Sequence, residues 1–491
     1  MTQPEPRTHT GHHMTPRHRI TLVVLLVAQF MLAVDFSILN VALPVIGSGL
    51  GFSLAALQWI ATAFALAAAG FTLLFGRIAD LFGRRRLFLL GLTVLGLSSL
   101  AGGLATEPWL LLTARVAQGL ATAAVTPAGL SLLTTSFPEG PLRERALGLN
   151  GALMSAGFTA GAVLGGVLTD LLSWRWAFLV NVPVAAAVLA VAPSVLKESR
   201  PADRPRLDVP GAATVTGGLL SLVYGLTRAG EDGWGDPLAA GALLLGAALL
   251  ALFYAVEARA AQPLVPVTVL RRRTVVWGNA AGLIAFATET SLVFLMTLYL
   301  QEVLGFSPLA AGLSFGVLGA GTVLGGTVAA RVIGRLGTRR TLVTGGLLQA
   351  AATGTLLLLG EGHGWLGLLL PATFAGGVGN MLVIVGFMVT ATSGLPDAEQ
   401  GMATGLATMT QQVGITLGTP VMSAVVTARA GDGPVLPGIG TAVAVNTLLV
   451  LLGVTLAAWL LRTPRAHARR AAAHTPSAAP ATPSPEPAAH R

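Results

Sequence analysis

The chain has no cysteine among its 491 residues, and only 10% of them are Asp, Glu, Lys or Arg. The lack of cysteine excludes a disulfide framework and any cysteine-ligated metal site. A soluble protein of this length needs far more charge to cover its surface, whereas 53% of these residues are apolar. The sequence therefore predicts a polytopic membrane protein.

Motifs for other kinds of chemistry are also missing. The chain has no Gly-x-x-x-x-Gly-Lys loop, so ATP is not expected to power it. It has no HExxH pattern, no intramembrane histidine cluster and no convincing Ser/His pair, which argues against an enzyme and against a bound metal or cofactor. A receptor would need a soluble output domain, and the two short tails supply none. Transport across the membrane remains the favoured class.

The apolar residues form fourteen runs of about 20 residues, each long enough to cross ~30 Å of hydrocarbon. We therefore predict an all-α membrane protein with fourteen transmembrane helices. They are expected near 20–46, 55–76, 87–106, 109–133, 146–170, 176–196, 209–228, 238–258, 275–301, 308–332, 341–360, 365–393, 399–428 and 439–461.

The sequence repeats itself at an offset of 254 residues. This offset relates Asp35 to Glu289, the run 50–53 to 304–307, and Gly83 to Gly337. Parallel repeats of this kind build the two halves of a transporter, with the binding site at their seam. We predict six-helix bundles at 19–196 and 275–462, a linker with two inserted helices at 197–274, and disordered tails at 1–18 and 463–491.

Charge sets the orientation. The chain has 30 Lys and Arg residues, and all but Arg115, Arg175, Arg228 and Arg429 fall on one set of alternating loops and tails. Cytoplasmic loops carry this excess in membrane proteins. Both termini are therefore expected in the cytoplasm of a plasma-membrane protein. The basic residues lie in short loops, which argues against nucleic acid as the partner, and we expect a monomer in the lipid bilayer.

Three charges lie inside apolar spans, namely Asp35, Arg115 and Glu289. At ~1.5 Å per residue, all three fall in one layer about 21–22 Å from the basic ends of their helices. Each costs about 2.5–3.5 kcal/mol at a helix centre, so none should face lipid. Asp35 and Glu289 are candidate proton carriers, and movement of Arg115 or of a cationic substrate would switch the protonation of Asp35. The alternative is a static Asp35–Arg115 ion pair that only holds two helices together.

Several motifs resemble the 14-helix drug/proton antiporters of the major facilitator superfamily, and together they cover roughly residues 20 to 462. The stretches that carry the resemblance are the first-helix run 35–44, the loop 76–86, the fourth-helix run 115–119, and the runs 174–183, 233–235 and 299–305. The resemblance implies a proton-driven antiporter without a cofactor, which exports amphipathic or cationic drugs or antibiotics by alternating access. A proton-coupled uptake symporter for a small organic solute remains the alternative, because coupled acids do not encode direction.

The remaining candidate residues follow from these motifs and from polar or aromatic side chains within the spans. We expect a substrate cavity lined by Phe36, Asn40, Trp59, Gln118, Phe286 and Asn380. The loop motif implies a gating latch made of Gly76, Asp80, Gly83, Arg84 and Arg85, although an arginine cluster that only fixes topology is the simpler interpretation.

The fifth span carries Gly157, Gly161, Gly165 and Gly166, a stripe of small residues that should admit a close helix neighbour. Ala162 stands where the antiporter motif has proline. The stripe therefore predicts helix packing more directly than it predicts export.

Overall fold

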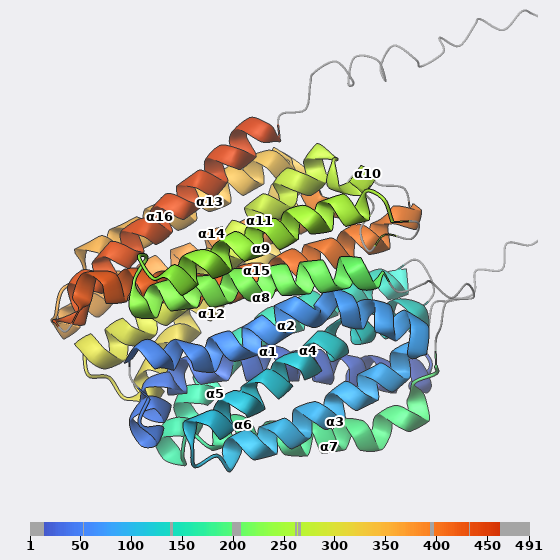
Figure 1. Cartoon of the computed structure of the whole chain (residues 1–491), viewed down its shortest axis with the longest axis horizontal. Helices are drawn as coiled ribbons and strands as arrows, with labels where there is room; N and C mark the ends of the chain where they lie inside the picture. The colour runs from blue at the N-terminus through green and yellow to red at the C-terminus, as the bar shows by residue number, and fades with distance from the viewer. Residues whose placement is uncertain are drawn as a thin grey trace, which may run out of the picture.

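The computed structural model describes most of the chain as one helical bundle (Figure 1). The described residues are 14–52, 54–137, 141–198, 208–260, 263, 267–392, 397–431 and 433–461. The tails predicted to be disordered lie almost entirely outside these ranges. The first helix begins at Pro16, which is within the stretch 1–18 that was expected to be disordered.

Long helices account for nearly all of the described residues. The N-terminal half contains α1 (Pro16–Leu50), α2 (Leu54–Phe82), α3 (Arg84–Gly103), α4 (Pro108–Ser136), α5 (Pro141–Leu171), α6 (Trp176–Leu179) and α7 (Asn181–Val195). The insert contains α8 (Val209–Asp232), α9 (Pro237–Glu257) and α10 (Val267–Leu270). The C-terminal half contains α11 (Arg273–Leu298), the π-helix η1 (Tyr299–Val303), α12 (Pro308–Leu336), α13 (Thr338–Thr355), η2 (Leu356–Leu358), η3 (His363–Trp365), α14 (Leu366–Thr392), α15 (Asp397–Ala430) and α16 (Val435–Leu460).

The prediction of an all-helical membrane fold with fourteen long helices is confirmed. Thirteen helical stretches of the described residues are long and apolar enough to cross a membrane. The shorter apolar stretch Ala156–Leu171 belongs to α5, which is as long as its neighbours. The short α6 continues almost directly into α7, and the two cross together as Trp176–Val195.

Both halves use the same helix pairings. The first helix of each half packs on the fifth (α1 on α5, α11 on α15), and the second and third pack on the fourth (α2 and α3 on α4, α12 and α13 on α14). The third also packs on the last long helix (α3 on α7, α13 on α16). The sequence repeat is thus a repeat of structure.

The repeat also extends to the turns. Gly51 and Gly305, at the offset of 254, both end a helix with φ near +70° (+75° and +67°). Gly83 and Gly337 likewise have positive φ, of +113° and +78°, at the start of the third helix of each half. Only glycine adopts such angles without strain, which explains why these positions carry the repeat in sequence.

The halves meet along two seams. At one seam α5 packs against α12, and at the other α2 packs against α15. The inserted helix α8 contacts both α2 and α15 and so covers the second seam, whereas α9 packs mainly on α8 (Figure 1). Thr216 of α8 donates to the carbonyl oxygen of Gly70 in α2 at 2.6 Å, and Tyr224 packs against Trp59 with ring centroids 6.2 Å apart. The insert therefore lies beside the seam between the halves.

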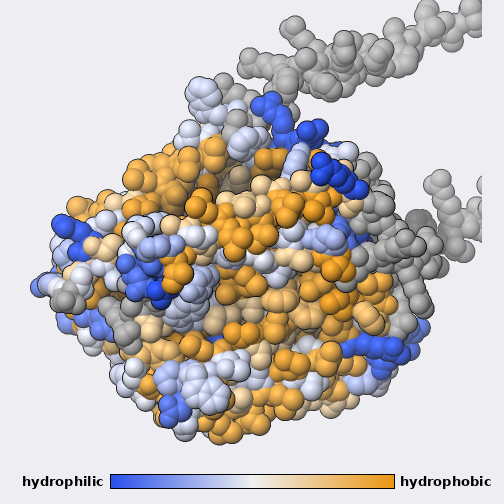
Figure 2. All heavy atoms as spheres, in the orientation of Figure 1, coloured by the Kyte–Doolittle hydropathy of each residue, from blue (hydrophilic) through white to orange (hydrophobic). Residues whose placement is uncertain are grey.

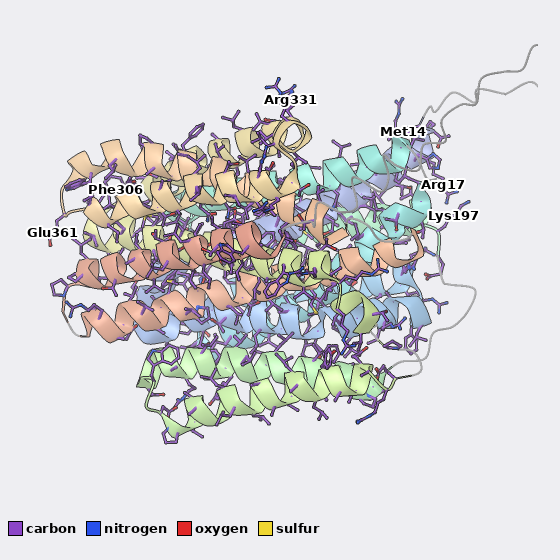
Figure 3. All side chains as sticks on the ribbon, turned by 90° about the horizontal axis from the view of Figure 1, so that it is seen from above. Met14, Arg17, Lys197, Phe306, Arg331 and Glu361 are labelled. Carbon is purple, nitrogen blue, oxygen red and sulfur yellow. The ribbon has the colours of Figure 1, made fainter. Side chains whose placement is uncertain are left out.

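The two ends of the bundle differ in charge. Arg17 and Lys197 lie at one end, which we call the basic end, whereas Phe306 and Glu361 lie at the other, the opposite end (Figure 3). On the face shown in Figure 2, hydrophobic residues cover the middle of the bundle and hydrophilic residues gather toward its two ends. This is the distribution expected of a protein whose middle part spans the lipid bilayer.

Candidate functional site

A buried ion pair lies within the N-terminal half. Asp35 of α1 is 0% exposed and Arg115 of α4 is 1% exposed. Arg115 Nη1 lies 3.5 Å from Asp35 Oδ2, and Arg115 Nε donates to the carbonyl oxygen of Ile60 at 2.9 Å. The two charges that sequence spacing placed at the same depth are therefore in contact.

Two amides complete the surroundings of Asp35. Gln118 Nε2 donates to Asp35 Oδ1 at 3.0 Å, and Asn181 Nδ2 donates to the same oxygen. Both amides also donate to Ser99 Oγ, at 2.8 Å from Gln118 and 3.3 Å from Asn181. The oxygen of Gln118 accepts from Arg115 Nη1 at 2.9 Å. We call these five side chains, which come from α1, α3, α4 and α7, the Asp35 network.

The network includes two residues that were not among the predicted site residues. Asn181 belongs to one of the motifs quoted above, and its amide in an apolar span was a usable signal. Ser99 gives no such signal, because a serine in a transmembrane helix can bond its own backbone. Only the approach of α3 to α4 and α7 shows that its hydroxyl accepts from the two amides that bind Asp35.

A large cavity lies between the two halves, with a volume of about 510 Å³. Its wall is rich in phenylalanine and methionine, with a few amides and threonines. The aromatic and sulfur-containing lining residues are Phe36, Phe64, Phe158, Phe286, Phe315, Met154, Met381 and Met388. Along α4, α5, α14 and α15 the lining extends from mid-helix toward the basic end, as Leu130 and Val389 show.

Aromatic rings separate this cavity from the Asp35 network. The guanidinium of Arg115 lies 4.2 Å from the centroid of the Phe64 ring, and Phe64 lines the cavity. Phe36, the next residue after Asp35, also lines it and lies 5.9 Å from Phe64 between ring centroids. Neither Asp35 nor Arg115 is in the lining. One layer of rings thus stands between the ion pair and the cavity.

Glu289 is placed differently from Asp35, although the repeat relates the two positions. Its carboxylate lines the cavity, among Phe286, Thr290 and Val293 of the same helix. No other charged side chain is in that lining, and no hydrogen bond or ion pair to Glu289 is found in the described part of the chain. The three charges predicted to lie in one layer therefore divide into a buried ion pair and a single acid in the cavity.

Of the six other residues predicted to line the cavity, some do so and others do not. Phe36 and Phe286 are part of its wall, whereas Asn40, Trp59, Gln118 and Asn380 are not. Gln118 belongs to the Asp35 network, and Asn380 donates to the carbonyl oxygen of Ala285 at 3.2 Å. Helix rotation explains the difference, because a residue at the right depth can still face its own half.

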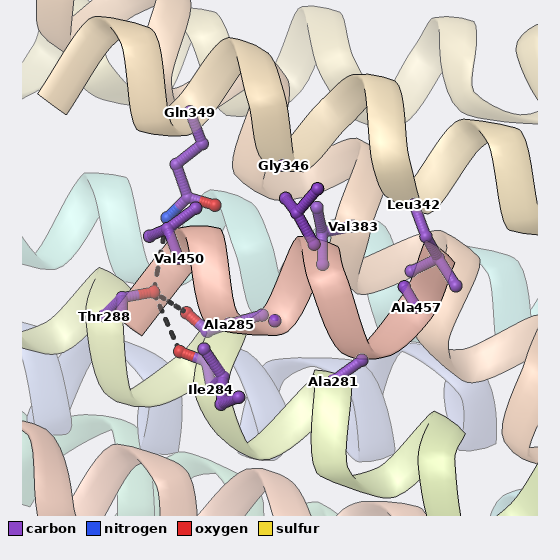
Figure 4. Close-up of a pocket in the computed structure, with 12 residues that line it drawn as sticks. Ala281, Ile284, Ala285, Thr288, Leu342, Gly346, Gln349, Val383, Val450 and Ala457 are labelled. Carbon is purple, nitrogen blue, oxygen red and sulfur yellow. Dashed lines mark hydrogen bonds between the residues drawn. The ribbon is translucent and has the colours of Figure 1, made fainter. Parts of the chain in front are cut away.

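The C-terminal half has an uncharged counterpart of the network. Gln349 Nε2 donates to Thr288 Oγ1 at 3.3 Å, and Asn446 donates to the carbonyl oxygen of Thr288 at 3.0 Å. Figure 4 shows Thr288 and Gln349 beside a small cavity of about 20 Å³ lined mostly by apolar residues. Among the described side chains of this half, no arginine takes the place of Arg115.

The arginines of the loop motif contact the end of their own half. The backbone N–H of Arg85 donates to Glu198 Oε1 at 3.1 Å, and its guanidinium donates to the carbonyl oxygen of Pro193 at 2.7 Å. Arg339 makes the equivalent contact in the second half, with the carbonyl oxygen of Ala458. A Cβ added to Gly76 would lie 3.8 Å from the Cβ of Pro127 in α4. The side chain of Asp80 lies outside the described residues. The gating latch of Gly76, Asp80, Gly83, Arg84 and Arg85 stays a prediction.

The glycine stripe of α5 permits close helix packing. A Cβ added to Gly157 or Gly161 would lie within 3 Å of a carbonyl oxygen of α1, and one on Gly165 would overlap the carbonyl oxygen of Ile38. Gly166 instead faces α12, where a Cβ would overlap the carbonyl oxygen of Pro308. Three of the four glycines therefore join α5 to α1, and the fourth joins it to the other half.

A duplicated helical bundle with a cavity at the seam of its halves defines a transporter of the alternating-access type. The model of the Major Facilitator Superfamily matches residues 25–419 and 280–488, and the chain belongs to this superfamily, whose members are transporters and not enzymes.

Curated relatives cover most of the chain. The cephamycin export protein CmcT of Amycolatopsis lactamdurans is 39% identical over 448 residues, which are 88% of this chain and 90% of the relative. The puromycin resistance protein pur8 of Streptomyces alboniger is 38% identical over 92% of this chain and 93% of its own length. The crystal structure of the human organic anion transporter MFSD10 has a TM-score of 0.60 at 18% identity, covering 90% of this chain and all of that one, which shows the fold.

Proposed function

We propose that the chain is a proton-driven antiporter of the plasma membrane that exports amphipathic or cationic drugs or antibiotics. The names of the relatives support export of antibiotics, since they include a cephamycin exporter and a puromycin resistance protein. The arginine-rich loops support an orientation with the basic end and both termini in the cytoplasm.

The observation that carries the proposal is the environment of Glu289. A carboxylate without a described partner, in a cavity walled by phenylalanine and methionine, attracts a cation that also carries apolar surface. Aromatic faces add cation–π attraction, and methionine adapts its shape to different ligands. The cavity volume of about 510 Å³ falls within the usual range for drug-sized ligands.

The Asp35 network is the proposed site of proton coupling. Phe64 touches both the guanidinium of Arg115 and the cavity, so a substrate that packs on this ring presses it toward Arg115 and holds the guanidinium against Asp35. A firmer contact with Arg115 favours the charged form of Asp35. Substrate in the cavity and a proton on Asp35 therefore oppose each other without direct contact between them, as antiport requires.

The transport cycle follows from this linkage. Opening at the opposite end would let a proton reach Asp35 and release the substrate outside. Opening at the basic end would return that proton to the cytoplasm, restore the Asp35–Arg115 pair and admit new substrate beside Glu289. The movement would rock residues 20–196 against 275–462 about the two seams.

Two experiments test the function. A resistance screen in a pump-deficient host identifies the substrate class, and everted vesicles then report coupling. Addition of a transported drug should collapse an inside-acid gradient in vesicles that contain the protein. If the gradient persists while the drug still moves, proton antiport is wrong. Drug uptake by intact cells would favour the symporter.

A further inference from the structure

Toward the opposite end, one segment of the C-terminal half contacts two helices of the N-terminal half. We call residues 299–312, which comprise η1, the turn after it and the start of α12, the closing segment. Gln301 Nε2 donates to the carbonyl oxygen of Val41 in α1 at 2.9 Å. Farther along, a Cβ on Gly312 would lie 2.8 Å from the carbonyl oxygen of Ala162 in α5. The segment therefore touches the first and the fifth helix of the other half.

The bond from Gln301 to Val41 lies beyond the cavity, whereas Ala162 is part of the cavity wall. The last lining residue of α11 is Val293, and Gln301 follows eight residues later, about 12 Å nearer the opposite end at ~1.5 Å per residue. On α1 the last lining residue is Phe36, five residues before Val41. The bond from Gln301 to Val41 therefore crosses between the halves above the cavity, where an exit path would have to open.

The closing segment is fixed firmly to its own half. The side chain of Tyr299 is fully buried, and its hydroxyl donates to the carbonyl oxygen of Gly360 at 2.7 Å. The ring of Phe306 stacks on His363 with centroids 5.3 Å apart. The π-helical turn adds a residue to the normal helical spacing, and such turns are often found at functional sites. Gln301 is thus a side chain on a rigid support that reaches across to the other half.

We propose that Gln301 is the clamp that holds the opposite end of the transporter shut, and that its bond to Val41 must break before the cavity opens there. The inference rests on the alternating access described under the proposed function. Loss of a single amide–carbonyl bond should shift the balance between the closed and open forms by several-fold, up to about tenfold.

The test measures the width of the opposite end directly. Because the chain has no cysteine, a variant with Leu172→Cys and Glu361→Cys carries spin labels at these two positions only. Both residues are exposed at the opposite end, and they belong to different halves. In Gln301→Leu, the population of the longer label distance should rise several-fold. Gln349→Leu is the matched control, because it removes a glutamine bond within one half, and its distances should stay as in the parent.

Gln301→Asn provides a second variant, since its side chain is shorter by one methylene and cannot span to Val41. Its label distances should resemble those of Gln301→Leu. If the leucine variant does not fold, the distances in Gln301→Asn test the clamp in its place. Unchanged distances in the Gln301 variants, or an equal change in Gln349→Leu, would overturn the clamp. The distances need neither a drug nor a proton gradient. Failure to export any drug would thus count against the proposed function and leave the clamp untouched.

Discussion

At the scale of single residues, the two acids related by the repeat have different surroundings. Asp35 is bound by Arg115, Gln118 and Asn181, whereas Glu289 faces the cavity. A buried ion pair is weak evidence for stability, because desolvation offsets most of the attraction. Under the proposed function, the network holds a carboxylate that alternates between its charged and neutral forms.

Asp35→Asn should abolish drug-induced proton release in everted vesicles. It should also lower the free energy of unfolding, because the Arg115 charge remains buried without its partner, which costs about 3–5 kcal/mol in comparable sites. Asp232→Asn is the control, because it removes an ion pair at a partly exposed site. Asp232 Oδ2 lies 2.7 Å from Arg228 Nη2. Normal gradient collapse in Asp35→Asn would remove Asp35 from the coupling mechanism.

Glu289→Gln should weaken export of cationic drugs while export of neutral drugs continues. The neutral amide keeps the size of the side chain but loses its attraction for a positive charge in the apolar cavity. Resistance profiles with matched cationic and neutral compounds measure the effect. Equal export of both classes by the variant would reduce Glu289 to a packing residue.

Spacing and motifs identified Asp35, Arg115 and Glu289 but could not identify their neighbours. Ser99 and Phe64 carry no pattern in the sequence that sets them apart from other residues in apolar spans. Their roles depend on the rotation of α3 and α2 about their axes, which contacts with other helices determine. For the same reason Asn40 and Asn380 lie outside the cavity wall despite suitable depths.

At the scale of helices, close packing of α5 on α1 depends on residues without side chains. Gly157, Gly161 and Gly165 bring the two backbones together, as the spacing of four predicted. The packing forms without the proline that the antiporter motif has at Ala162. The insert helix α8 is joined to α2 in another way, through the hydroxyl of Thr216.

Gly165→Val should destabilise the N-terminal half by about 1–3 kcal/mol, because the new side chain would overlap the carbonyl oxygen of Ile38. Gly241→Val is the control, since a Cβ there meets nothing within 4 Å. Thermal unfolding in detergent compares the two. Similar losses in both variants would show that helix propensity, and not packing on α1, explains the effect.

Thr216→Val should loosen α8 from α2 at a cost of about 0.5–1.5 kcal/mol, by removing its hydrogen bond to Gly70. Thr214→Val on the same helix is a matched control, because Thr214 bonds only to carbonyl oxygens of its own helix. The stability of the purified protein in denaturant measures the difference. If both variants lose the same stability, the contact with α2 contributes nothing.

At the scale of the whole molecule, the two ends differ in charge and in closure. The basic end carries Arg17 and Lys197, and the cavity extends toward it. At the opposite end the closing segment joins the halves beyond the cavity, through the bond from Gln301 to Val41. This combination suits a form that takes up substrate from the basic end.

Cysteine labelling should establish the orientation. In intact cells, a membrane-impermeant maleimide should react with Glu361→Cys and not with Lys197→Cys, because arginine-rich loops stay in the cytoplasm. Both residues are exposed, and the parent chain contributes no cysteine. Lysed cells are the control, in which both variants should react. Labelling of Lys197→Cys alone from outside would reverse the assignment of the two ends.

The sequence by itself determined the class of protein, the fourteen helices and the duplication. These properties are local, because each span must separately satisfy the length and polarity of the bilayer, and each repeated glycine must adopt its own backbone angle. Tertiary structure alone decided that Glu289 and not Asp35 faces the cavity, that α8 covers the seam of α2 and α15, and that Gln301 reaches Val41. Those outcomes depend on how helices far apart in the chain rotate and tilt against one another, which no single span encodes.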